Sequence, residues 1–246
     1  MGMFSDVTTE GLEKTEDRLG GYSVLDTDAY PMTIAVAYAV QSAGGAKGIV
    51  IVAKDDDNKE YRETVYYTSK EGKNYYTTKE SPDKKIPLPG MVTVDHVCLA
   101  TTEKPLSEQA TEEKIVKVWN SEERKELPVS VHVLTGLTGK KVIFGIRKNL
   151  ENKSVKQGST YVPTAEERET NNIEKVFHFP TKLTMTEAQT DVKEAAFHDA
   201  WVEKNKGKVT DKRTIKDGSA GTAGRPSTGA PQDSGGGAGV KSLFGS

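Results

Sequence analysis

The sequence has a single cysteine, Cys98, among 246 residues. One cysteine cannot close a disulfide within the chain, so we expect a reducing, intracellular compartment. No apolar run approaches the roughly 18 residues that a membrane helix needs, because the best candidate, 34–40, is short and ends at Gln41. The first residues also lack the basic flank and apolar core of a signal peptide. These absences predict a cytoplasmic protein with no membrane role.

Histidine is scarce as well, and its placement argues against a metal site. The four histidines are His96, His132, His178 and His198. Only His96 lies close to Cys98, and zinc sites normally need two closely spaced pairs. The segment 134–141 has leucine where a phosphate-binding loop needs its first glycine, and no Gly-x-Ser-x-Gly sequence occurs. We therefore expect no enzyme activity, no metal and no cofactor.

Glycine is concentrated at one end of the chain. Ten of the 23 glycines fall within the last forty residues, and residues 218–239 are almost entirely Gly, Ser, Ala, Thr and Pro. Such a composition cannot bury enough apolar surface to fold. We expect a domain over residues 1–205 and a tail over 206–246 that is first basic, then disordered, and ends with the apolar pair Leu243 and Phe244.

Runs of β-branched and aromatic residues predict strands. The segments 33–40 and 48–53 are separated by Gly44-Gly45 and predict a hairpin, and a third strand follows at 61–68. The chain is expected to turn at 71–74 into a tyrosine-rich strand over 75–78. The prolines of 86–90 then end this meander.

The second half of the domain predicts further strands and two helices. Strands are expected at 114–119, 141–148 and 172–179, a short helix at 93–101 and a closing helix at 186–204. In the strand 141–148, the face of Val142, Phe144 and Ile146 should be buried. Turns rather than long crossover helices join consecutive strands, so we predict a mainly β (α+β) fold, an OB-fold-like (oligonucleotide-binding) partly open barrel with inserted helices.

Aromatic and basic residues alternate along the predicted strands, which is the mixture that holds single-stranded nucleic acid. Bases stack on flat rings while Lys and Arg follow the phosphates. The candidate binding residues are Tyr66, Tyr67, Lys73, Tyr75, Tyr76, Trp119, Lys140, Lys141, Arg147 and Lys148. Two alternatives remain open: the basic runs can be solvated faces, and one tyrosine of each adjacent pair should point into the core, because neighbouring side chains of a strand face opposite ways.

The N-terminal stretch 4–14, with 17–21 and 26–31 after it, resembles the start of single-stranded DNA-binding proteins of tailed bacteriophages. The segments 85–90 and 241–245 resemble that family too. The resemblance implies an OB-type core that coats single-stranded DNA during replication, recombination and repair in the host cell cytoplasm. It also implies a tail that recruits replication or recombination proteins. Residues 218–246 of the tail carry a net charge of +1 rather than an acidic run, so Leu243 and Phe244 are the expected contact.

Sequence-tolerant binding of single-stranded DNA is therefore the predicted function. The alternative, from a different class, is a structural or adaptor protein whose β-rich domain binds another protein and whose tyrosines only pack. The sequence does not specify the oligomeric state.

Overall fold

The computed structural model describes residues 24–216, except 121, 122, 124, 159, 191 and 193. Within this range the protein is mainly β, as predicted, with one eight-stranded and one two-stranded sheet. Most of the N-terminal motif, and residues 217–246 of the predicted tail with Leu243 and Phe244, lie outside the described residues. No helix in the described part is long and apolar enough to span a membrane.

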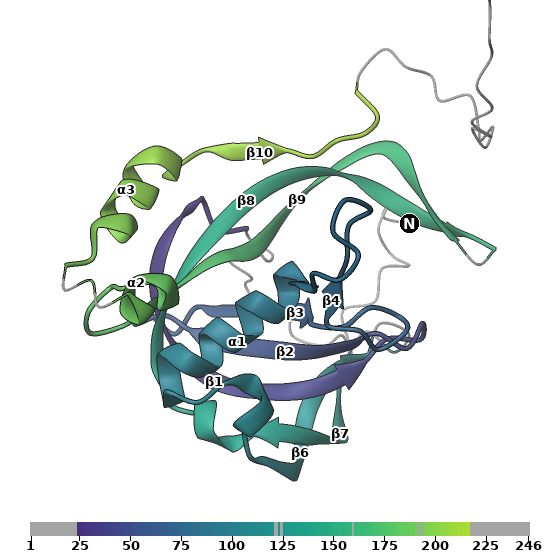
Figure 1. Cartoon of the computed structure of the whole chain (residues 1–246). Coiled ribbons are helices and arrows are strands. Elements are labelled where there is room, and N and C mark those ends of the chain that lie inside the picture. Colours follow the sequence, from purple (N-terminus) through teal and green to yellow (C-terminus); the bar gives the residue numbers. More distant parts are fainter. Residues whose placement is uncertain are drawn as a thin grey trace, which may run out of the picture.

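Ten strands and three α-helices form the described part of the chain (Figure 1). The strands are β1 (Asp28–Gln41), β2 (Lys47–Lys54), β3 (Glu60–Tyr66), β4 (Tyr75–Tyr76), β5 (Ile86–Pro87), β6 (Thr111–Asn120), β7 (Lys125–Leu134), β8 (Lys141–Gln157), β9 (Thr160–His178) and β10 (Val209–Asp211). The helices are α1 (Pro89–Thr102), α2 (Met185–Gln189) and α3 (Ala196–Asn205), with short 3-10 helices at η1 (Leu106–Glu108) and η2 (Thr135–Leu137).

The large sheet is built around β1 and β8. Antiparallel pairing gives the order β3-β2-β1-β8-β9, and β10 pairs with β8 in parallel beyond the end of β1. The predicted β1–β2 hairpin is confirmed, and Gly45 adopts a φ of 92° in its turn, a conformation that favours glycine. Among the described residues, β3 and β9 do not pair with each other, so the sheet is not closed.

The main core lies between one face of this sheet and α1, which Figure 1 shows lying in front of β2. Helix α1 starts at Pro89, whose fixed φ suits a first helical position, and it buries Val94, Val97 and Cys98. Burial raises the pKa of the Cys98 thiol to about 12, so the thiol stays protonated. The predicted buried face of β8 is confirmed, because Val142, Phe144 and Ile146 are all fully buried.

The opposite face of β1 and β2 packs against the β6–β7 hairpin. Tyr38, Val50 and Val52 meet Val133 there, with Val116 and other valines of the hairpin partly buried around them. The hairpin joins the large sheet through one pair, Tyr38 with Val133, so side-chain packing holds most of it in place.

The C-terminal helical region differs from the single helix predicted over 186–204. A capping box between Thr184 and Glu187 starts α2, which ends at Gln189. The Glu187 carboxylate also accepts a hydrogen bond of 3.0 Å from the backbone N–H of Phe197, so it ties the start of α3 to α2. Trp201 of α3 then covers Ile143, which buries the second face of β8 as well.

The folded part extends past residue 205, into the segment that the sequence analysis assigned to the tail. After β10, the Asn152 side chain accepts hydrogen bonds from the backbone N–H groups of Thr214 and Ile215, at 2.8 and 2.9 Å. The basic run of this segment is also engaged, because Arg213 pairs with Asp211 and Glu167. Residues 206–216 are therefore packed against the domain.

Two strand predictions are wrong in detail. The tyrosine-rich strand does not continue the large sheet, because β4 is only two residues long and pairs with β5, which contains Pro87. The strand expected at 172–179 is the end of β9, which begins at Thr160 and forms a long ribbon with β8. The strands at β1, β2, β3, β6 and β8 and the helix α1 are confirmed.

Candidate nucleic-acid interface

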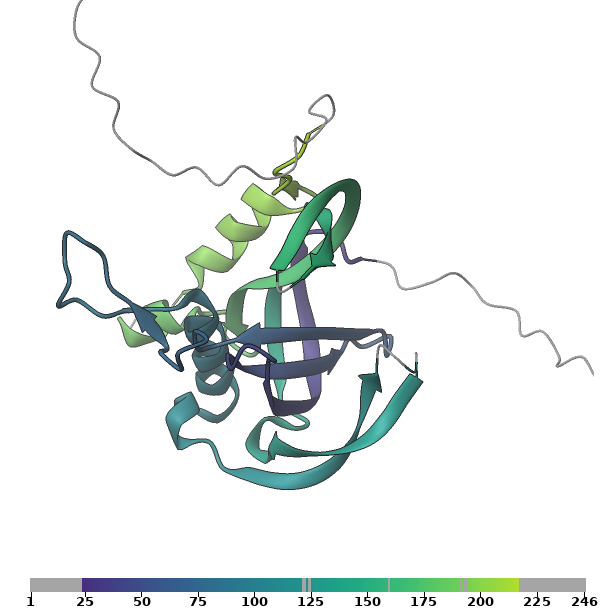
Figure 2. The ribbon, with the colours of Figure 1, turned by 90° about the vertical axis from the view of Figure 1, so that its right-hand side faces the viewer.

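Residues 67–88, which we call the β4–β5 lobe, follow β3 and project from the same side of the molecule as α1 (Figure 2). A turn closed by the hydrogen bond from the Ser69 N–H to the Lys73 carbonyl leads into β4. The register Tyr75 with Pro87, and the bond from the Leu88 N–H to the Asn74 carbonyl, bring the chain back to α1. The lobe therefore starts at the end of β3 and ends at the first turn of α1.

Four of the predicted stacking residues gather at this lobe. Tyr66 and Tyr76 are each 46% exposed, whereas Tyr67 packs against the main core. Tyr75 is half-buried beneath the ammonium group of Lys85, which lies 4.8 Å from the ring centroid. The prediction that one tyrosine of each adjacent pair points into the core is confirmed for Tyr66 and Tyr67. It is wrong for Tyr75 and Tyr76, because both rings line one hollow of the lobe, outside the core clusters.

Tyr66 owes its position to a glycine on the neighbouring strand. A Cβ atom added to Gly48 would lie 3.0 Å from the Cδ1 atom of the Tyr66 ring, so the ring packs closely against this glycine. The pair is in register on β2 and β3, on the sheet face opposite the main core. The absence of a side chain at position 48 therefore leaves room for the Tyr66 ring on this face.

The lysines of the lobe are exposed, and none of them forms a salt bridge with an acid among the described residues. They are Lys70, Lys73, Lys79, Lys84 and Lys85, against the acids Glu71, Glu80 and Asp83. The pKa of the Glu71 carboxyl is lowered, first because the Ser69 hydroxyl donates a hydrogen bond to it. The lobe thus carries a net charge of +2, with its ammonium groups available to an anion.

A hollow of about 530 Å³ lies within the lobe. The rings of Tyr75 and Tyr76 and the lysines Lys73 and Lys85 line it, together with the acids Glu71 and Asp83. Phosphates and bases of a single strand need this combination of groups. The hollow therefore brings together three predicted residues, Lys73, Tyr75 and Tyr76, with Lys85, which was not predicted. Tyr66 and Tyr67 directly precede the lobe but do not line this hollow.

The predicted basic residues of β8 lie elsewhere and are engaged with acids. Arg147 pairs with Glu174 and donates a hydrogen bond of 2.8 Å to the Asn205 side chain, which ties β8 to α3. Lys148 pairs with Asp26 and Glu169. Lys141 lies 3.6 Å from Asp56. Contrary to the sequence analysis, the structure does not place these cations beside the tyrosines.

Lys140 and Trp119 are also separate from the lobe. Lys140 lines a hollow with Thr102 and Lys104 at the C-terminal end of α1. Trp119 is 55% exposed on β6, and its neighbour Val118 packs inward. The β6–β7 hairpin contains five acids and four bases, so Trp119 does not lie in a basic surface.

The lysines that complete the lobe have a local sequence signal. Lys84 and Lys85 directly precede the strand Ile86–Pro87, and their register against β4 places Lys85 over Tyr75. No protein-family model and no curated protein matches the chain.

Proposed function

We propose that the protein binds single-stranded DNA with little sequence preference and without enzymatic activity. The observation that carries this proposal is the β4–β5 lobe, where Tyr75 and the exposed Tyr76 share a hollow with Lys73 and Lys85. The five lysines of the lobe form no salt bridge among the described residues, and the exposed Tyr66 directly precedes the lobe. Stacking and phosphate contacts of this kind do not distinguish one base from another. A role in coating DNA during replication and recombination, with partner recruitment through Leu243 and Phe244, extends the same proposal.

The strand order supports the OB-like part of the proposal. A five-stranded partly open barrel is consistent with the order β3-β2-β1-β8-β9, with α1 following β3 and the β6–β7 hairpin as an insertion. OB folds bind oligonucleotides on the face of their second and third strands. Tyr66 lies on that face of β3.

Removing charge from the lobe should weaken DNA binding and its salt dependence. Each phosphate contact contributes about 0.7 to the slope of log K against log salt concentration for single strands. We expect the double variant Lys73→Gln/Lys85→Gln to flatten that slope by about 1.4. Fluorescence anisotropy with an unstructured oligonucleotide at several salt concentrations measures it.

The matched control is Lys114→Gln/Lys125→Gln, which removes the same charge from lysines that pair with Glu112 and Glu123. For this control, the slope of log K against log salt concentration should equal that of the unmodified protein. Equal slopes for both double variants would show that the phosphates bind elsewhere.

Truncating the tyrosines should separate stacking from packing. We expect Tyr66→Ala and Tyr76→Ala each to lose about 1 to 3 kcal/mol of DNA-binding free energy with little change in Tm, because exposed rings stack on bases. Tyr67→Ala should instead lower Tm, since this ring packs against the core. The stacking proposal fails if Tyr66→Ala and Tyr76→Ala both bind DNA normally.

One observation favours the adaptor alternative. Ile115 is 77% exposed and shares the outer face of β6 with Trp119, so two large apolar side chains lie exposed on this face, on either side of Lys117. Exposed apolar groups of this kind mark protein-binding surfaces. If the full chain shows no salt-sensitive oligonucleotide binding, this surface becomes the leading site.

A further inference from the structure

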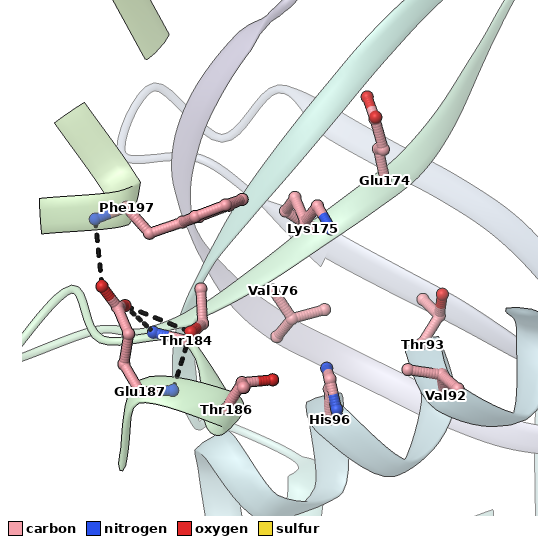
Figure 3. A pocket seen from close by; sticks show the side chains of 10 residues that line it. All are labelled: Val92, Thr93, His96, Glu174, Lys175, Val176, Thr184, Thr186, Glu187 and Phe197. Atoms are coloured by element: carbon pink, nitrogen blue, oxygen red, sulfur yellow. Dashed lines mark hydrogen bonds between the residues drawn. The ribbon is translucent and has the colours of Figure 1, made fainter. Parts of the chain in front are cut away.

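A pocket of about 280 Å³ lies between α1, β9, α2 and the start of α3, outside the β4–β5 lobe (Figure 3). Its walls include the side chains of Val92, Val176 and Phe197. Phe197 is 41% exposed, and the Nζ atom of Lys175 lies 5.4 Å from the centre of its ring. The pocket therefore combines an apolar slot with one ammonium group at a flat ring.

The position of Phe197 is fixed by Glu187. The Glu187 carboxylate accepts hydrogen bonds from the backbone N–H groups of Thr184 and Phe197, at 2.9 and 3.0 Å, and from the Thr184 hydroxyl at 3.1 Å. Figure 3 shows these bonds at the α2 side of the pocket. The negative charge of the Glu187 carboxylate is thus balanced by three hydrogen-bond donors, and the ring of Phe197 is held in place as one wall of the pocket.

Two polar groups of the pocket have no hydrogen-bond partner among the described side chains. Figure 3 shows the His96 imidazole on α1 and the Thr186 hydroxyl on α2 facing the same space. Burial lowers the pKa of His96, and the charge of Lys175 acts in the same direction against that of Asp95. The ring is therefore neutral at pH 7, with one N–H donor and one nitrogen acceptor.

The pocket adjoins the lobe along the chain. Leu88 lines the hollow of the lobe, and Val92 lines the pocket one helical turn later, a distance of about 5.4 Å along the axis. The bond from the Val92 N–H to the Leu88 carbonyl fixes this relation. The lobe hollow and the pocket thus share the first turn of α1 as a common wall element.

We infer that the pocket receives one nucleobase of the bound single strand. The base stacks on Phe197, its polar edge meets His96 and Thr186, and Lys175 contacts the adjoining phosphate. Pockets for small ligands typically pair apolar walls with a few converging polar groups in this way. This inference rests on the proposed function and adds to it a site that reads one base.

The test combines variants with a free nucleotide. Phe197→Ala removes the stacking wall, and Thr186→Val removes a hydroxyl with little change in size. We expect Phe197→Ala to weaken binding of an unstructured oligonucleotide by about 5- to 100-fold, and Thr186→Val to change the preference among homopolymers. Val209→Ala, at an exposed residue of β10 away from the pocket, should bind as the unmodified protein does.

A titration of the unmodified protein with millimolar thymidine 5′-monophosphate tests the pocket without any substitution. Its result therefore cannot be caused by the unfolding of a variant. We expect the ring signals of His96 in the NMR spectrum to shift, and those of His132 to stay in place. If the oligonucleotide binds but neither Phe197→Ala nor the nucleotide has an effect, the pocket inference is wrong and the proposed function stands. If the unmodified protein binds no oligonucleotide, the proposed function fails, and the inference fails with it.

Discussion

Replacing Gly90 with alanine should destabilise the protein by about 3 kcal/mol or more, a large part of the stability of an ordinary domain. A Cβ atom at this position would lie 1.9 Å from the carbonyl oxygen of Tyr66 and 2.9 Å from its carbonyl carbon. Both are backbone atoms of β3, so no side-chain rotation can relieve the overlap. Either α1 must move away from β3 or the end of β3 must bend.

The reason for glycine here is space rather than backbone conformation, because Gly90 does not have a positive φ. Glycine near a helix start is otherwise unfavourable relative to alanine by up to about 1 kcal/mol. Its presence therefore reflects the close approach of α1 to β3. Since that approach is made at Tyr66 itself, the same substitution should also weaken DNA binding by displacing the ring.

Thermal unfolding measures the effect, and we expect Tm to fall by about 6 to 12 °C. Gly44→Ala is the matched control, because its Cβ would meet only the flexible Lys70 side chain at an ordinary 3.5 Å. That variant should keep Tm within a few degrees of the original. Equal Tm values for the two variants would mean that α1 does not approach β3 this closely.

The sequence predicts the strands whose alternation is enforced by burial. Val142, Phe144 and Ile146 alternate because one face of β8 meets the core. Beyond Asn152 the β8–β9 ribbon is largely exposed, so burial does not select apolar residues there and the segment shows no pattern. The three residues of β10 are too few to carry a pattern at all, and the Asn152 side chain fixes the backbone that follows them.

The candidate site could also be predicted only in part. Tyr66, Lys73 and Tyr76 could be predicted because the lobe is continuous in sequence and its composition is local. Which cations are available could not, because the acids that engage Arg147 and Lys148 lie about twenty or more residues away, at Glu174, Asp26 and Glu169. The charge of a basic segment follows from its sequence, but the distant carboxylates that the fold places beside it do not.

The Glu63 side chain connects β3 and β9, the two edge strands of the large sheet that do not pair with each other. Its carboxylate accepts a hydrogen bond of 2.7 Å from the Ile173 N–H on β9 and another of 2.7 Å from the Tyr61 hydroxyl on β3. Burial raises the pKa of Glu63, although these hydrogen bonds and the charge of Lys212 oppose the shift. One acidic side chain thus takes the place of strand pairing at this seam.

Glu63→Ala should cost about 2 to 4 kcal/mol of stability, because it leaves the Ile173 N–H without its acceptor and opens a cavity at the seam. Glu63→Gln keeps one acceptor and most of the volume, so it should cost less. Denaturant unfolding of the three proteins at neutral pH measures both values. A neutral Glu63→Ala variant would show that the seam does not depend on this carboxylate.

The pH dependence of Glu63→Gln isolates the raised pKa, since every other titrating group is common to both proteins. Between the ordinary pKa of glutamate, about 4.3, and the higher value in the fold, the folded protein holds a proton that the unfolded chain has released. Unfolding then releases a proton, so the contribution of Glu63 to stability is complete below this window and declines as pH rises through it. We expect the unfolding free energy of the unmodified protein, relative to Glu63→Gln, to fall from pH 4 upward and then level off. Parallel curves would mean that Glu63 titrates as it does in water and that the seam is open to solvent.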